Sequence, residues 1–219
     1  MHTRALRRYY AAEIEADFVV HLLGLLAGAI GATVLLTLAA PTNPATLCSA
    51  FAYSVGLMAM LGFSAAYHTQ RSSERRELLR RLDHAAIFVM IAGTYTPFTA
   101  CVLDGAYAIW LTGSMWLAAL AGLAVKLLYP RRFEWASTVV YLALGWAVVI
   151  FMRPLLAALD RPTLILLVSG GILYSIGAGI HRWRRLPFHD AIWHALVVVA
   201  ASCHYAAILH GVVLIAPRS

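Results

Sequence analysis

Histidine, serine and aspartate residues that could bind a metal ion or move protons occur in pairs at helical spacing. Ser64 and His68 are four residues apart, and so are Asp190 and His194. Residues four apart share one face of a helix and lie about 6 Å apart along its axis. Imidazole and carboxylate groups bind zinc, and a neighbouring hydroxyl or carboxyl group can donate or accept protons. The spacing therefore indicates metal-assisted chemistry.

Other polar residues could join these pairs. Asp83 and His84 are adjacent, and Glu13, Asp17 and His21 would form a stripe along one helix face if the first helix begins before the membrane. Ionisable groups inside the hydrocarbon are costly unless they are paired, hydrated or bound to metal. Each of these residues is accordingly a candidate for the site.

Two further histidines near the C-terminus need a different explanation. His189 and His194 are five residues apart, so on a helix they point in directions that differ by about 140°. We do not expect both to bind one ion. His204 follows His194 by ten residues, which places it about 15 Å deeper along a helix. We expect His204 to make an interhelical hydrogen bond instead.

The composition indicates that most of the chain lies in lipid. The 219 residues are 62% hydrophobic and 12% charged, with a mean hydropathy of +0.77. Soluble domains carry about 25% charged residues, whereas a membrane-crossing helix needs about 20 apolar residues. Seven stretches of roughly that length are bounded by charged or turn residues: 18–40, 47–67, 82–103, 107–128, 135–151, 163–180 and 191–216.

We therefore predict an all-α integral membrane protein with seven transmembrane helices in a single domain, residues 1–219, preceded by a cytoplasmic segment at residues 1–17. The basic residues predict its orientation. Of the 17 Lys and Arg residues, only Arg153, Arg161 and Arg218 fall on the side opposite the N-terminus. Cytoplasmic loops carry the excess of basic residues, so we expect a cytoplasmic N-terminus and an outside C-terminus. The charge of +7 then reflects orientation signals, and nucleic acid is not an expected partner.

This orientation brings polar groups from several stretches of chain to one membrane depth, the cytoplasmic ends of the predicted helices. These groups are His21, Ser64, His68, Asp83, His84, His181, His189, Asp190 and His194. The orientation was inferred from Lys and Arg alone, so the convergence of the other polar groups is independent support for a site at this depth.

Three segments of the chain resemble bacterial hemolysin III-like proteins of the PAQR family. They are SAAYH (64–68), LDHAAIFVMIAGTYTPF (82–98) and FHDAIWH (188–194), the last continued by SCH (202–204). The PAQR family includes the adiponectin receptors and is more remotely similar to alkaline ceramidases. The resemblance covers nearly the whole chain. It implies a seven-helix protein of the bacterial inner membrane that holds a zinc ion (Zn2+) at its cytoplasmic side.

The resemblance also implies roles for particular residues. Carried over position by position, it makes His68 and His194 zinc ligands. Ser64 and Asp83 become catalytic groups or groups that support the ligands. The likeness to ceramidases implies an amide bond in a membrane lipid as the substrate, reached from within the bilayer.

The chain departs from the family pattern at two positions. Asp190 stands where the family has a histidine, four residues before the last ligand. We expect Asp190 to be the third ligand, because two histidines and a carboxylate suit a catalytic zinc ion with an open position. Two alternatives remain: His189 replaces the missing histidine ligand, or the protein binds the metal more weakly. Asp17 stands where the family usually has Asn, in a stretch where Glu13 and His21 match.

The expected reaction is hydrolysis by a zinc-activated water. Asp83 could take the proton, and Ser64 could donate a hydrogen bond to the developing oxyanion. Two other functions remain open: a non-enzymatic sensor or regulator with a structural metal site, which four protein ligands usually close, and a membrane-perturbing cytolytic protein. A haem carrier is disfavoured because only His204 lies near mid-membrane, and a retinal protein because the only lysine, Lys126, is outside the last stretch.

Overall fold

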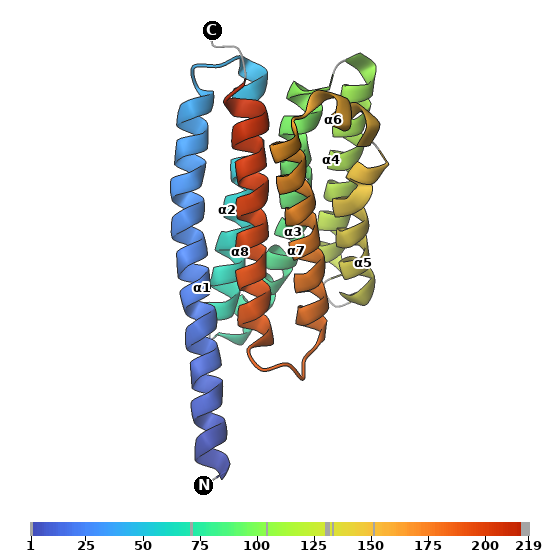
Figure 1. Cartoon of the computed structure of the whole chain (residues 1–219). Helices are drawn as coiled ribbons and strands as arrows, with labels where there is room; N and C mark the ends of the chain where they lie inside the picture. Colours follow the sequence, from blue (N-terminus) through green and yellow to red (C-terminus); the bar gives the residue numbers. More distant parts are fainter. Residues whose placement is uncertain are drawn as a thin grey trace.

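The computed structural model describes residues 2–70, 72–103, 105–129, 132, 134–150 and 152–215, and the side chains of these residues except at 2–11, 134 and 152. The described chain is helical, with no β-strand among these residues. Figure 1 shows the long helices running side by side in one bundle. The predicted all-α fold is confirmed.

Among the described residues, six helices are long and apolar enough to cross a membrane. They are α1 (His2–Ala39), α2 (Pro44–Thr69), α3 (Ser73–Cys101), α4 (Gly105–Leu128), α7 (Arg161–Arg182) and α8 (His189–Ile208), the last extended by a π-helical turn (Leu209–Val213). These helices correspond to six of the seven predicted stretches.

The predicted fifth stretch, residues 135–151, is not one continuous α-helix, and a further short helix follows it. The structure has α5 (Glu134–Gly145), a 3-10 turn (Trp146–Val149) and the short helix α6 (Met152–Ala158). The cause is a side chain from α3. The Tyr95 hydroxyl donates to the Leu144 carbonyl oxygen at 2.9 Å and accepts from the Val148 amide at 2.7 Å. A group inserted into the backbone ladder in this way interrupts an α-helix.

Side-chain caps mark the beginnings of two membrane helices. The Asn43 side chain accepts a hydrogen bond from the Thr46 amide at 2.9 Å, and Pro44 occupies the first turn of α2. The Asp160 side chain accepts from the Thr163 amide at 3.2 Å at the start of α7. Such caps satisfy amide groups that the helix leaves unpaired. The hydrogen bonds from Thr163 also hold the pKa of the exposed Asp160 carboxyl below its ordinary value.

Two glycines let α2 and α3 approach each other closely. A Cβ at Gly56 would lie 3.0 Å from the Met90 Cα, and a Cβ at Gly93 would lie 3.0 Å from the Ala52 carbonyl oxygen. Small residues at helix contacts permit this spacing in membranes. The contact places the C-terminal half of α2 beside the N-terminal half of α3, which contains Asp83.

The remaining helices pack around this pair. α1 packs against α2 and α8, α4 packs against α3, and α7 packs against α8. Figure 1 shows that the first turns of α1 project beyond one end of the bundle, where α8 also begins. The last described turn lies at the opposite end. The predicted outside C-terminus, residues 216–219, lies beyond the described residues.

Candidate metal centre

Four ionisable side chains meet at the end of the bundle where α1 and α8 begin. They are Asp17 and His21 from α1, His68 from α2 and His194 from α8. One possible ligand atom from each lies within 4.8 Å of those of the other three. Asp17, His21 and His194 are buried. Three imidazoles and a carboxylate could hold a metal ion, and this donor set suits zinc.

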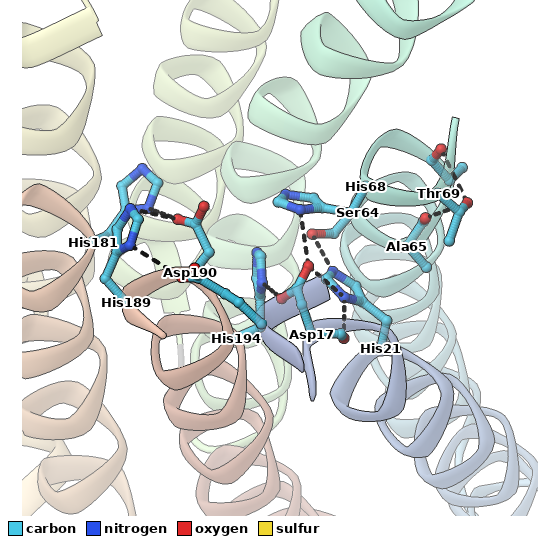
Figure 2. A network of polar contacts seen from close by, with 12 residues as sticks. Asp17, His21, Ser64, Ala65, His68, Thr69, His181, His189, Asp190 and His194 are labelled. Carbon is cyan, nitrogen blue, oxygen red and sulfur yellow. Dashed lines mark hydrogen bonds and ion pairs between the residues drawn. The ribbon is translucent and has the colours of Figure 1, made fainter. Parts of the chain in front are cut away.

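The Asp17 carboxylate joins the two histidines that the sequence predicts as ligands. Its Oδ1 lies 2.6 Å from His194 Nδ1, and its Oδ2 lies 3.0 Å from His68 Nδ1 (Figure 2). A carboxylate only accepts hydrogen bonds, so Nδ1 of each ring donates and Nε2 of the neutral ring keeps its lone pair. Carboxylates that contact metal-binding histidines orient them in this manner.

His21 also carries its lone pair on Nε2, because its Nδ1 is hydrogen-bonded to the backbone of its own helix. Its Nδ1 donates to the Asp17 carbonyl oxygen at 2.8 Å, and its Nε2 accepts from the Ser64 hydroxyl at 3.2 Å. The His21 ring centroid lies 4.3 Å from that of His194 and 5.0 Å from that of His68. All three imidazoles therefore have Nδ1 engaged and carry the lone pair on Nε2, which in His21 accepts from the Ser64 hydroxyl.

Asp190 belongs to a separate group of side chains. Its Oδ1 lies 3.3 Å from His181 Nδ1 and 3.4 Å from His189 Nε2, and His189 Nδ1 lies 3.6 Å from Glu13 Oε1. Figure 2 shows Asp190 with the two histidines as one network and the Asp17 contacts as another. Asp190 is not among the four residues whose ligand atoms converge. Its assignment as the third ligand, and the alternative of His189, stay predictions.

Ser64 and Asp83, the two predicted catalytic residues, lie beside the four-residue cluster. The Ser64 hydroxyl lies within hydrogen-bonding reach of both His21 Nε2 and the Asp83 carboxylate, and its single proton can be donated to one of them at a time. Both residues line the same cavity as the cluster. The structure thus brings together His68, His194, Ser64 and Asp83 from three helices, and their proposed roles stay predictions.

The sequence predicts His68 as a metal ligand but gives Asp17 and His21 only as candidates for the site. The stripe of Glu13, Asp17 and His21 depended on a helix that begins before the membrane, and α1 does begin at His2. The spacing of four residues was therefore the available signal. Nothing in the sequence shows how α1 is rotated against α2 and α8. That rotation turns Asp17 and His21 toward the cluster, while Glu13 meets His189.

A cavity of about 2190 Å³ extends from the cluster into the bundle. Many of its deeper walls are apolar, among them Phe98, Leu111, Leu155, Leu164 and Leu167. His204 also lies on this wall, and its Nε2 donates to the Leu167 carbonyl oxygen of α7 at 3.2 Å. The predicted interhelical hydrogen bond of His204 is confirmed.

The fold and the cluster define the class of protein: a helical integral membrane protein with a candidate metal centre at one end of its bundle. The family model for Haemolysin-III related proteins matches residues 15–205, and the chain belongs to this family. Family membership and the six apolar helices fit an integral location in the inner membrane of a bacterium.

Individual relatives agree with this assignment. The chain is 34% identical to the Hemolysin-3 homolog of Bacillus subtilis (strain 168) over 195 residues, 89% of this chain and 92% of that protein. It is 33% identical to Hemolysin-3 of Bacillus cereus over 201 residues, 91% of this chain and 92% of that protein. The Adiponectin receptor protein of Drosophila melanogaster is 26% identical over 188 residues, 74% of this chain and 41% of that protein. No solved structure matches the chain. The resemblance to the PAQR family is confirmed.

Proposed function

We propose that this protein is a zinc-dependent hydrolase of amide bonds in membrane lipids. The observation that carries the proposal is the convergence of three imidazoles and a carboxylate at the polar end of a large cavity within the bundle. The cavity offers apolar walls to an acyl chain, and the cluster offers ligands to a metal ion. Zinc with an open coordination position supplies polarisation of a carbonyl group and activation of water.

In this proposal His21, His68 and His194 hold the ion through Nε2. Each of the three rings has Nδ1 engaged by Asp17, through its carboxylate or its backbone carbonyl. His21 thereby takes the place for which the sequence offered Asp190. Three histidine ligands leave one position for water or substrate, as catalytic zinc sites require.

Ser64 and Asp83 would act on the substrate from the cavity wall. The Ser64 hydroxyl lies between His21 Nε2 and the Asp83 carboxylate. Once His21 Nε2 serves the metal, the Ser64 proton can be donated to a substrate oxygen as that oxygen gains negative charge. Asp83 can accept a proton from the attacking water and pass it to the amine that leaves.

We further propose seven crossings with a cytoplasmic N-terminus. The additional crossing would consist of α5, the 3-10 turn and α6 together. Figure 1 supports this count because α5 and α6 lie toward opposite ends of the bundle, as do the start of α1 and the last described turn. The excess of basic residues in the loops near the cluster supports a cytoplasmic position for the metal centre.

The proposed activity can be tested in lipid vesicles that contain the purified protein and a ceramide. We expect release of free fatty acid, detected by mass spectrometry, because the acyl chain can enter the cavity and place its amide group at the cluster. Removal of the metal with a chelator should stop the release, and added zinc should restore it. The His194→Ala variant in the same vesicles is the control. Zinc-loaded wild-type protein that releases no fatty acid from any lipid amide would contradict the proposal.

A non-enzymatic sensor or regulator is the second candidate, because the cluster contains four possible donors. If the Asp17 carboxylate binds the ion directly, four protein ligands close the coordination shell, as in structural zinc sites. The metal would then fasten α1, α2 and α8 together without an open position for substrate.

The Asp17→Asn variant separates these two candidates. If Asp17 orients His68 and His194, we expect zinc affinity to fall about 10–100-fold while saturating zinc still binds with water in the open position. Competition with a metal-binding dye measures the affinity, and X-ray absorption gives the coordination number. Glu15→Gln changes an exposed carboxylate on the same helix and serves as the control. A wild-type shell of four protein ligands that loses one in Asp17→Asn would favour the sensor.

A further inference from the structure

The deep part of the cavity contains polar groups that the proposed reaction does not use. We propose that Tyr174 and His204 form a subsite that binds a hydroxyl group on the hydrocarbon chain of an amphiphilic ligand whose head lies at the metal centre. This inference rests on the proposed function, because it takes the cavity to be the place of a lipid chain. It adds a selectivity for hydroxylated chains.

Tyr174 provides the first observation. Its hydroxyl oxygen is buried and is the only buried side-chain oxygen or nitrogen without a hydrogen-bond partner in the part of the chain that the structure describes. A buried hydroxyl that has lost its contact with water and gained no partner is destabilising. Tyr174 also lines the cavity, so the group that satisfies the hydroxyl can come from a molecule in the cavity.

His204 supplies a complementary acceptor. Its Nε2 donates to the Leu167 carbonyl oxygen at 3.2 Å, so Nδ1 of the neutral ring is an acceptor. Gly170 makes room for the ring, since a Cβ there would overlap His204 Nε2 and Cδ2. The imidazole is therefore held by its Nε2 side, and no hydrogen bond to Nδ1 exists among the described residues.

The two side chains are neighbours on the cavity wall. The ring centroids of Tyr174 and His204 lie 5.5 Å apart, and the rings are tilted by 54°. A hydroxyl both donates and accepts. One ligand hydroxyl could therefore donate to His204 Nδ1 while it accepts from Tyr174. A hydrocarbon chain without a polar group would leave both of these positions unpaired.

The depth of the subsite matches the length of a lipid chain. His204 follows His194 by ten residues on α8, which places it about 15 Å deeper. The hydrocarbon layer of a membrane is roughly 30 Å thick, so this depth is about half of it, which is the thickness that the chains of one leaflet occupy. The α8 residues that line the cavity between the two histidines are Val197 and Val198. The pattern is a polar head site, an apolar passage and a second polar site.

The test compares stearate with a series of hydroxystearates that carry the hydroxyl at successive mid-chain carbons. Displacement of a fluorescent fatty acid from purified, zinc-loaded protein gives each affinity. We expect one isomer to bind about tenfold more tightly than stearate. The gain comes from hydrogen bonds between its hydroxyl group and the otherwise unpaired Tyr174 hydroxyl and His204 Nδ1. In Tyr174→Phe this preference should largely disappear while stearate binds as before. Tyr205→Phe, which removes a hydroxyl from α8 outside the residues that line the cavity, should keep the preference.

Equal binding of stearate and every hydroxystearate by the wild type would overturn the subsite but leave the lipid cavity in place. A preference that persists unchanged in Tyr174→Phe would also overturn it. If the wild type binds none of these acids, the subsite and the proposed lipid cavity fail together. The wild-type series tests the inference even if a variant is unstable.

Discussion

Zinc is expected to be lost from the purified protein when His68 or His194 is replaced with alanine. Both rings present Nε2 as a lone-pair donor because Asp17 engages their Nδ1 atoms. Removal of a ligand should weaken binding by more than the about 10–100-fold that loss of an orienting partner costs. Elemental analysis of equal preparations measures the zinc content, and gel filtration in detergent checks that each variant is folded.

The same measurement decides which residue is the third ligand. We expect His21→Ala to lose zinc and Asp190→Ala to retain it, because His21 lies in the converging group and Asp190 contacts His181 and His189 instead. His181→Ala removes an imidazole from the Asp190 network and is the matched control. Zinc that persists in His21→Ala but is lost in Asp190→Ala would contradict His21 and support Asp190 as the third ligand.

Hydropathy and charge were sufficient to predict six long helices, since each has a continuous apolar stretch bounded by polar residues. The fifth stretch shows the limit of this reasoning. Its composition is as apolar as the others, but the Tyr95 hydroxyl from α3 takes the backbone groups of Leu144 and Val148 and breaks the helix. An interruption caused by a side chain distant in the sequence leaves no local signal.

The candidate site shows a similar limit. Spacing and charge distribution brought His68, His194 and two carboxylates, Asp17 and Asp190, to one end of the bundle. They gave Asp190 as the third ligand, with His189 as the alternative, because Asp190 lies four residues before His194 on the same face, and they gave Asp17 no ligand role. The packing of α1 against α2 and α8 brings the Asp17 carboxylate to two histidines from other helices, a contact that spacing along the chain does not show. Such rotations depend on side-chain packing across several helices.

Ser64→Ala and Asp83→Asn are expected to slow lipid-amide hydrolysis strongly while zinc stays bound. Removal of a donor that stabilises a developing oxyanion lowers kcat about 100–1,000-fold, and loss of a general base costs about 100–10,000-fold. Fatty acid release in vesicles gives the rate, and the zinc content of the same samples shows that the centre is intact. Wild-type rates in both variants would remove these residues from the mechanism.

The matched controls remove a serine hydroxyl and an aspartate charge at positions that do not contact the metal-binding residues. Ser54→Ala deletes a hydroxyl that donates to the Ala50 carbonyl oxygen of its own helix at 2.8 Å, and Asp160→Asn neutralises an exposed carboxyl at a helix start. Both should keep wild-type rates. The Ser64 hydroxyl donates to His21 Nε2 in the structure, so its removal could also act through that histidine. If Ser64→Ala loses zinc together with activity, Ser64 is needed to build the metal centre; if only the rate falls, the hydroxyl acts on the substrate.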